Sequence, residues 1–207
     1  MQIAVLTFDG FNELDSFIAA GILNRMRPQG WKAFITCPSE TVTSMNGVTI
    51  QAEKPLEFAA QADAVLIGSG MKTRDIAKDA ALLAQIQLDP TRQLIGAQCS
   101  GTLLLSKLGL LGGRPACTDL TTKPWVIEAG VEVLDQPFYA DGNIATAGGC
   151  LASQYLATWI LMRGAGTDAA KAAIHYVAPV GQKEDYVARA ITAVQPFLPV
   201  QQAAATH

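Results

Sequence analysis

One stretch, Gln93-Leu-Ile-Gly-Ala-Gln-Cys-Ser-Gly-Thr-Leu-Leu-Leu-Ser-Lys-Leu-Gly109, carries the pattern that decides the fold. Its first half, residues 93–99, is mostly apolar, which is typical of a short strand buried on both faces. Its second half, residues 102–109, is rich in leucine and predicts a helix. Cys99 stands where the strand ends, and Gly101 gives the backbone room to turn. The stretch therefore predicts a strand that passes directly into a helix, with a cysteine on the bend.

The same alternation extends over the rest of the chain. Buried strands are predicted over 2–8, 31–37, 64–67 and 144–147, with a hairpin over 42–50 around the turn Asn46-Gly47. Helices are predicted over 14–26, 73–87, 102–109, 124–129, 151–162, 168–176 and 183–197, with short strands at 116–117 and 131–134. Alternating strands and helices indicate an α/β sandwich of three layers, in which helices cover both faces of a mostly parallel, doubly wound sheet. We expect one domain over 1–198 and a flexible tail over 199–207.

Composition excludes several classes of protein. Half of the 207 residues are hydrophobic and 16% are charged, which excludes a disordered or coiled-coil chain. The 18 acidic and 15 basic residues leave a formal charge of −3, so capture of nucleic acid is not expected. No apolar run reaches the roughly 20 residues that span a bilayer, and Met1–Phe8 does not resemble an export signal. We therefore expect a cytoplasmic protein, away from membranes, with its four cysteines reduced.

No metal or cofactor is expected from the motifs. None of the four cysteines forms a Cys-x-x-Cys pair, and Asp119 and His175 lack the spacing of metal ligands. The turn Gly68-Ser69-Gly70 lacks the rest of a nucleotide-binding pattern. Cys37 is expected to be a small buried hydrophobe, as is Cys117.

Cys99 is the strongest candidate for chemistry. Its place on a sharp strand-to-helix turn is typical of a nucleophile elbow. The start of the following helix predicts a lowered pKa for the thiol, because a helix N-terminus favours a thiolate. The amide of Ser100 is expected to be free to hold an oxyanion.

Two further strand ends are expected beside Cys99, because ligands of open α/β sheets bind at the carboxyl ends of strands. The turn Gly68-Ser69-Gly70 offers backbone amides, of which that of Gly70 is the best candidate to complete an oxyanion hole. The loop after the first strand supplies a carboxylate, and spacing alone does not choose between Glu13 and Asp15. Leu14 is expected to face the core, in phase with later apolar residues of its helix.

Together these residues resemble the ThiJ/PfpI superfamily, which has a class I glutamine amidotransferase-like, flavodoxin-like fold. The resemblance covers about residues 1–165 and rests on Asp9-Gly-Phe-Asn-Glu-Leu-Asp15, Val65-Leu-Ile-Gly-Ser-Gly70, Gly96-Ala-Gln-Cys-Ser-Gly-Thr102, Leu108-Gly-Leu-Leu-Gly-Gly113 and Thr146-Ala-Gly-Gly149. It implies that Cys99 is the nucleophile and that Asp15 is the acid beside it. It implies an oxyanion or substrate site at Gly68, Gly70, Ser100, Asp119 and Gly149. It also implies a homodimer with its active sites close to the interface.

Two positions depart from the pattern of this superfamily. Ser100 stands where the protease-like branch has a histidine, and Asp119 stands where other branches have one. His175 is expected to be a structural or surface residue. Without a Cys–His pair, hydrolysis of a peptide is not expected, because no base would protonate the amine that leaves.

The set that remains looks most like the isonitrile hydratase branch, which adds water to R–NC to give an N-substituted formamide. The alternatives are a glyoxalase-like or deglycase-like activity on α-oxoaldehydes, and a non-catalytic module that binds a ligand or senses oxidants through Cys99. Cys150 is either a packed cysteine at a helix start or a second reactive thiol, and the sequence leaves this open.

Overall fold

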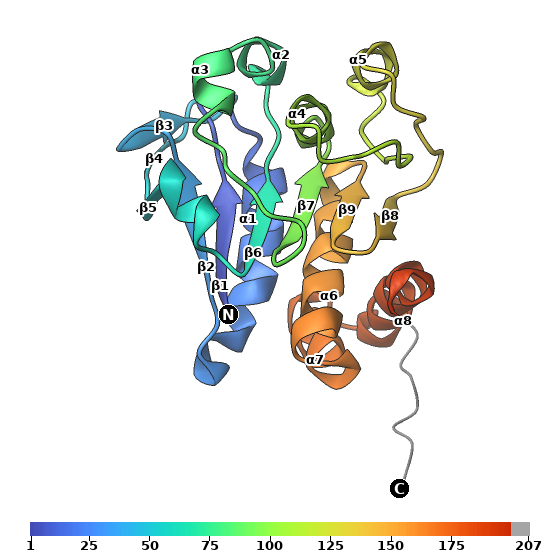
Figure 1. Ribbon diagram of the computed structural model, residues 1–207. Helices are drawn as coiled ribbons and strands as arrows, with labels where there is room; N and C mark the ends of the chain where they lie inside the picture. The colour runs from blue at the N-terminus through green and yellow to red at the C-terminus, as the bar shows by residue number, and fades with distance from the viewer. Residues whose placement is uncertain (200–207) are drawn as a thin grey trace, which may run out of the picture.

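The computed structural model describes residues 1–199 and contains a seven-stranded sheet in the order β5-β2-β1-β6-β7-β9-β8 (Figure 1). Six strands are parallel, and β8 runs antiparallel to β9. The strands of this sheet are β1 (Gln2–Leu6), β2 (Lys32–Cys37), β5 (Lys54–Pro55), β6 (Ala64–Ile67), β7 (Leu94–Gln98), β8 (Phe138–Asp141) and β9 (Ile144–Ala147). A separate hairpin pairs β3 (Thr41–Thr43) with β4 (Thr49–Gln51), as the Asn46-Gly47 turn predicts.

Helices cover both faces of the sheet, which confirms the three-layer arrangement (Figure 1). One core packs the sheet against α1 (Glu13–Leu23), α6 (Ser153–Gly164), α7 (Thr167–Val177) and α8 (Lys183–Val194). The opposite core packs it against α4 (Gly101–Lys107), α5 (Lys123–Glu128) and the segments around α2 (Thr73–Ile76) and α3 (Ala80–Leu83). Side chains on a strand alternate between the two cores: Ala64 and Leu66 enter the first, Val65 and Ile67 the second.

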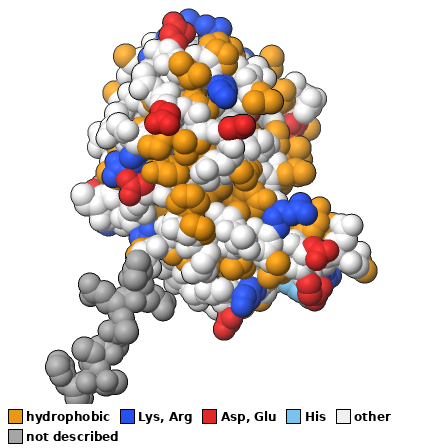
Figure 2. Space-filling view, turned by 90° about the vertical axis from the view of Figure 1, so that its right-hand side faces the viewer, with side chains coloured by type: hydrophobic (Ala, Val, Ile, Leu, Met, Phe, Trp, Pro, Cys, Tyr) orange, Lys and Arg blue, Asp and Glu red, His pale blue; other side chains and the backbone are white. Residues whose placement is uncertain are grey.

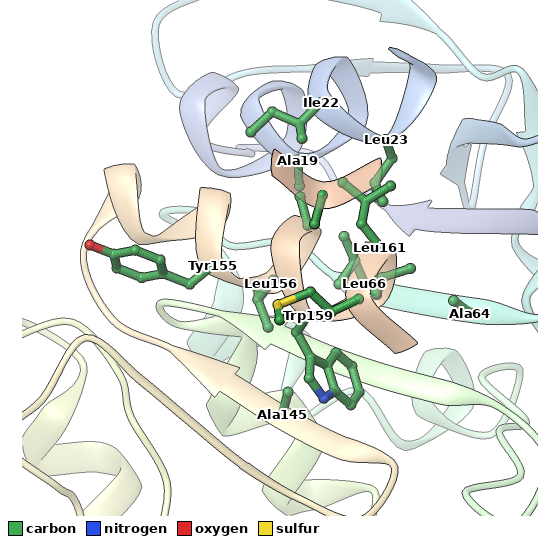
Figure 3. Packing of buried hydrophobic residues seen from close by; sticks show 14 of the residues in the cluster. Ala19, Ile22, Leu23, Ala64, Leu66, Ala145, Tyr155, Leu156, Trp159 and Leu161 are labelled. Carbon is green, nitrogen blue, oxygen red and sulfur yellow. The ribbon is translucent and has the colours of Figure 1, made fainter. Parts of the chain in front are cut away.

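The helix α6 forms the centre of the first core. Figure 3 shows Leu156 and Trp159 directed toward the sheet near Ala145, while Ala19 of α1 approaches α6 from the other side. Both α6 side chains are fully buried, so replacing Leu156 by alanine is expected to cost about 2–5 kcal/mol. At Gly96 of β7 a Cβ atom would lie 3.0 Å from a methyl group of Leu156, so glycine allows this close packing.

The structure differs from the predicted elements at a helix, at two short strands and at one strand that was not predicted. The helix expected over 73–87 is two short helices, α2 and α3, because the Asp79 carboxylate caps a new helix by accepting from the Leu82 amide. The strands expected at 116–117 and 131–134 make only an isolated bridge between Ala116 and Val133. The strand β8 was not expected, because it is a four-residue edge strand joined to β9 by a tight turn.

The surface carries few charges. Figure 2 shows one face on which hydrophobic side chains are spread between single charged ones, as expected for a chain with 16% charged residues. Among residues 1–199, no helix has both the length and the hydropathy that crossing a bilayer requires. The predicted tail, apart from Pro199, lies outside the described residues.

Candidate active site

Four loops meet at one end of the sheet, because β1, β6, β7 and β9 are consecutive neighbours and run parallel. The carboxyl end of each strand leads into one loop: residues 7–12, the turn Gly68-Ser69-Gly70, the bend at Cys99, and Gly148-Gly149. The arrangement agrees with the rule that ligands of open α/β sheets bind at this edge.

Cys99 adopts the sharp bend that its place between strand and helix predicts. Its φ of +47° makes it the one residue other than glycine with positive φ in the described part of the chain. The amide of Cys99 donates to the Ala147 carbonyl at 2.8 Å, and the Thr118 hydroxyl donates to the Cys99 carbonyl at 2.8 Å. Such a backbone costs about 1–3 kcal/mol and persists only where its surroundings impose it.

Gly101 allows α4 to start against the end of β6. A Cβ atom at this position would lie 2.4 Å from the Ile67 carbonyl oxygen and 2.7 Å from that of Gly68. A larger residue would push α4 away from the sheet, and the Cys99 side chain with it.

A pocket of about 530 Å³ opens over Cys99. Its lining comes from the loops that follow the four strands, from the start of α1, from the β3–β4 hairpin, and from α5 and the segment before it. The lining residues are Asn12, Asp15, Met45, Ser69, Gly70, Met71, Cys99, Ser100, Asp119, Thr121, Thr122, Trp125 and Cys150. Cys99 is only 3% exposed, so its sulfur lies at the bottom of the pocket. The pocket therefore admits a slim reactive group to the thiol more readily than a bulky one.

Asp15 is the carboxylate that the structure brings to Cys99. Asp15 lies in the first turn of α1 and is 3% exposed. The Ser69 hydroxyl donates to its Oδ2, whereas Oδ1 is buried without a hydrogen-bond partner among the described residues. An Asp15 carboxylate oxygen and the sulfurs of Cys99 and Cys150 all lie within 4.8 Å of one another.

Glu13 is not the carboxylate beside Cys99, so the structure decides between Glu13 and Asp15 in favour of Asp15. Its carboxylate accepts from the Ser44 hydroxyl at 2.5 Å and from the Asn46 side-chain amide at 2.8 Å. The bond from Ser44 is the main cause of a lowered pKa for Glu13. Glu13 therefore ties the start of α1 to the β3–β4 hairpin.

Leu14 does not face the core, contrary to the prediction. It is 51% exposed, and Phe17 on the next turn of α1 is 38% exposed. The helix instead buries Asp15, Ser16, Ala19, Ala20, Ile22 and Leu23. The apolar positions of α1 thus do not share one buried face, because Leu14 and Phe17 are exposed whereas Ile22 is buried.

The predicted lowering of the Cys99 pKa is wrong. Burial raises the pKa of this thiol, and the negative charge of the neighbouring Asp15 raises it further. The prediction considered only the helix N-terminus, whose effect is smaller than desolvation at a residue this deeply buried. The structure therefore favours the thiol form of Cys99, with Asp15 beside it.

The turn Gly68-Ser69-Gly70 holds Ser100 in place. The amide of Gly70 donates to the Ser100 hydroxyl oxygen at 3.1 Å, and that oxygen lies 2.8 Å from the Thr73 hydroxyl oxygen. The Gly70 amide is thus already engaged. The amide of Ser100 has no acceptor among the described residues, so it is the donor best placed for an oxyanion.

The other predicted binding residues differ in position. Asp119 lines the pocket and accepts from the Thr122 amide at 2.9 Å. Gly68 and Gly149 lie outside the lining: the Gly68 amide donates to the Leu6 carbonyl, and the Gly149 carbonyl accepts from the Gln98 side chain at 2.9 Å. These two glycines shape the loops behind the pocket.

Several lining residues were not predicted as site residues. Asn12 caps α1 through its Oδ1 and donates from Nδ2 to the Cys150 sulfur at 3.3 Å. Trp125 forms part of the rim and stacks under the Arg74 guanidinium, 4.3 Å from the ring centre. The helix-capping role of Asn12 can be predicted from its place before α1. Its contact with Cys150 cannot, because the two residues lie 138 positions apart in the sequence. His175 lies elsewhere, on α7, with its Nε2 at 3.5 Å from a carboxylate oxygen of Glu184 on α8.

The cluster of Asp15, Cys99 and Cys150 also has the spacing of three ligands for one ion. Two thiolates and a carboxylate suit a thiophilic ion such as Zn²⁺. The motifs did not predict such a site, because its members come from three separate segments.

Comparison with known proteins identifies the family and agrees with the fold. A model of the DJ-1/PfpI family matches residues 1–163. A search of curated protein sequences found no match. Among solved structures, Schizosaccharomyces pombe DJ-1 is similar with a TM-score of 0.74 and 19% identity, covering 86% of this chain and 100% of that one.

Two further structures have the same TM-score of 0.74 and 21% identity. The alignment with Drosophila melanogaster DJ-1beta spans 85% of this chain and 96% of that protein. The alignment with a ThiJ/PfpI family protein from Pseudomonas syringae spans 94% of this chain and 87% of that protein. Similarity at this level of identity supports the fold and leaves the reaction to the geometry of the site.

Proposed function

Because the chain belongs to the DJ-1/PfpI family, we propose that it is a cysteine-dependent enzyme that hydrates an isonitrile to an N-substituted formamide. Cys99 is the nucleophile, and Asp15 is the acid and base. The observation that carries the proposal is the closeness of the buried Cys99 thiol, whose pKa is raised, to the Asp15 carboxylate. Oδ1 of Asp15 has no hydrogen-bond partner in the described part of the chain.

The first step uses both the sulfur and the proton of Cys99. Sulfur attacks the terminal carbon of R–NC while Asp15 takes the thiol proton and delivers it to that carbon. The product is a thioimidate, R–N=CH–S–Cys99, which contains every atom of the substrate and the enzyme. A raised pKa of Cys99 suits this step, because the thiol keeps the proton that the carbon needs until the substrate is bound.

The second step consumes water. Asp15 removes a proton from a water molecule that attacks the thioimidate carbon and passes this proton to the nitrogen. Asp15 then takes the proton of the new hydroxyl as the C–S bond breaks, returns it to the Cys99 sulfur, and R–NH–CHO leaves. The amide of Ser100 has no acceptor among residues 1–199 and would stabilise negative charge on the new oxygen.

The shape of the pocket favours a linear electrophile. The isonitrile group is a slim rod with its reactive carbon at the tip, so it reaches a thiol that is 3% exposed. Peptide hydrolysis fits less well, because no histidine lines the pocket within residues 1–199 and an amine leaving group needs a proton donor.

A second candidate reaction is addition of Cys99 to the aldehyde of an α-oxoaldehyde. The unpaired Ser100 amide favours it, because the tetrahedral adduct carries a negative oxygen that this amide would bind. Asp15 would then move a proton from the adduct carbon to the neighbouring carbon, which gives a 2-hydroxyacyl thioester on Cys99. Water would hydrolyse this thioester to a 2-hydroxy acid and return the free thiol.

The experiment is a comparison of formamide production from a small alkyl isonitrile, with methylglyoxal and a chromogenic amide as parallel substrates. The wild type is expected to form the formamide, and Cys99→Ala is expected to lose at least a thousandfold in rate. Cys37→Ala serves as a matched control, because Cys37 is a buried cysteine outside the pocket. Formamide production that persists in Cys99→Ala would overturn the proposal, and consumption of methylglyoxal alone would replace it with the second candidate.

We further propose a homodimer formed through the exposed apolar face of α1. Phe17 lines a groove of about 420 Å³ together with Leu151 and Val177, and Leu14 extends the same helix face. Leu151 directly follows Cys150, so this surface lies next to the pocket. A second copy of the chain would cover these side chains.

The proposed location is the cytoplasm, and the proposed reaction depends on a reducing compartment. All four cysteines are unpaired, and the reaction requires a free thiol at Cys99.

A further inference from the structure

Cys150 is a chemical group that the proposed reaction does not use. It begins the 3-10 helix η3 (Cys150–Ala152), lines the same pocket as Cys99, and is partly exposed. Its sulfur lies within 4.8 Å of the Cys99 sulfur, with the Asp15 carboxylate at the same range from both.

We propose that Cys150 and Cys99 form a reversible disulfide that closes the pocket, and that Cys150 is the thiol that first reacts with a hydroperoxide. This inference does not depend on which reaction the site catalyses, because it concerns only the two thiols and their neighbours.

Accessibility assigns the first oxidation to Cys150. Cys99 is 3% exposed, whereas Cys150 is open to the pocket and to solvent. The Asn12 amide donates to the Cys150 sulfur at 3.3 Å, which partly opposes the rise in the pKa of this thiol that burial and Asp15 cause. Access to the oxidant, and not a lowered pKa, therefore distinguishes Cys150 from Cys99. In this step the Cys150 sulfur attacks one peroxide oxygen, the O–O bond breaks, and Cys150–SH with ROOH gives Cys150–SOH with ROH.

Asp15 assists the second step. It accepts the proton of the Cys99 thiol while sulfur attacks the Cys150 sulfenic acid. The S–O bond breaks, and the leaving hydroxide takes that proton and departs as water. The product is one disulfide, and a dithiol reductant returns both thiols by exchange.

Disulfide formation requires the two sulfurs to approach each other from within 4.8 Å. A disulfide joins its sulfurs at about 2.0 Å, so the Cys150 side chain must turn toward Cys99. Cys150 follows Gly149, which has a φ of +89° and no atom within 4 Å of an added Cβ. Cys99 is fixed by its strand and by α4, so Cys150 is the partner that moves.

The test is a count of free thiols after treatment with one to two equivalents of hydrogen peroxide, in the presence of EDTA so that no bound ion protects the pair. N-ethylmaleimide labelling under denaturing conditions is expected to fall from four thiols to two in the wild type. Peptide mapping is expected to find the Cys99 and Cys150 peptides joined, and dithiothreitol is expected to restore four thiols.

Variants identify the order of the steps. Cys37→Ala/Cys117→Ala keeps only the proposed pair and is expected to lose both remaining thiols. Cys99→Ala is expected to accumulate a dimedone adduct on Cys150, because no partner resolves the sulfenic acid. Cys150→Ala and Cys150→Ser are both expected to retain three free thiols at this peroxide dose.

Two results would overturn the inference. One is a sulfinic acid on Cys99 with Cys150 still free in the wild type. The other is that Cys150→Ala and Cys150→Ser lose as many free thiols as the wild type does.

Discussion

The Ser69 hydroxyl donates a hydrogen bond to Oδ2 of Asp15, while Oδ1 of the same carboxylate has no partner among residues 1–199. A buried oxygen without a partner is costly, and it persists where it serves a ligand or a proton transfer. Ser69 thus fixes one oxygen of a carboxylate that lies within 4.8 Å of the Cys99 sulfur and leaves its other oxygen without a partner.

Replacing Ser69 by alanine is expected to lower kcat by about ten- to a hundredfold while KM changes little, because a free Asp15 carboxylate loses its orientation toward Cys99. Steady-state kinetics of formamide production provide the measurement. Ser39→Ala is the matched control, because that hydroxyl donates to the Thr41 carbonyl away from the pocket. A Ser69→Ala enzyme with wild-type kcat would show that Ser69 does not orient Asp15.

The bend at Cys99 predicts an unusual order of stability. With φ at +47°, Cys99→Gly is expected to be more stable than Cys99→Ala by about 1 kcal/mol, because glycine adopts this backbone without strain. Urea unfolding of the two variants measures the difference. In an ordinary strand or helix, a glycine variant is less stable than the alanine variant. If Cys99→Gly unfolded more easily than Cys99→Ala, the strained bend would be wrong.

The reactivity of Cys99 is expected to rise with pH well beyond neutrality. Burial and the charge of Asp15 raise the pKa of this thiol, so the thiolate fraction grows about tenfold per pH unit below that pKa. The rate of iodoacetamide labelling of the Cys99 peptide is therefore expected to increase from pH 6 to pH 9 without levelling. A plateau below pH 8 would indicate the lowered pKa that the helix N-terminus alone predicts.

The homodimer is expected to depend on Phe17. Phe17→Glu places a charge in the proposed apolar interface, so the mass in solution is expected to halve, as measured by light scattering coupled to size exclusion. Ile127→Glu is the control, because Ile127 is an exposed apolar residue on α5, outside the groove that Phe17 lines. If both variants keep the mass of the wild type, a dimer through α1 is wrong.

The sequence was sufficient to predict the sheet edge and the bend at Cys99, because both depend on local patterns. A buried strand abuts a helix at residues 93–109, and the turn at 68–70 follows another buried strand. The rotation of α1 could not be predicted in the same way. It depends on Ser44 and Asn46 holding Glu13, contacts that span more than 30 residues.

The errors have related causes. Leu14 was assigned to the core because apolar spacing does not reveal whether another part of the chain covers that face. The pKa of Cys99 was misjudged because it depends on the depth of the pocket and on Asp15, neither of which a helix start reveals. Cys150 approaches Cys99 only once β7 and β9 have paired.

The most direct test of the central claim is the intact mass of the protein after rapid mixing with a small isonitrile and an acid quench. The account predicts a transient covalent adduct with the full mass of the isonitrile, located on the peptide that contains Cys99 and missing in Cys99→Ala. Formamide production without any adduct on that peptide, and at an equal rate in Cys99→Ala, would contradict it.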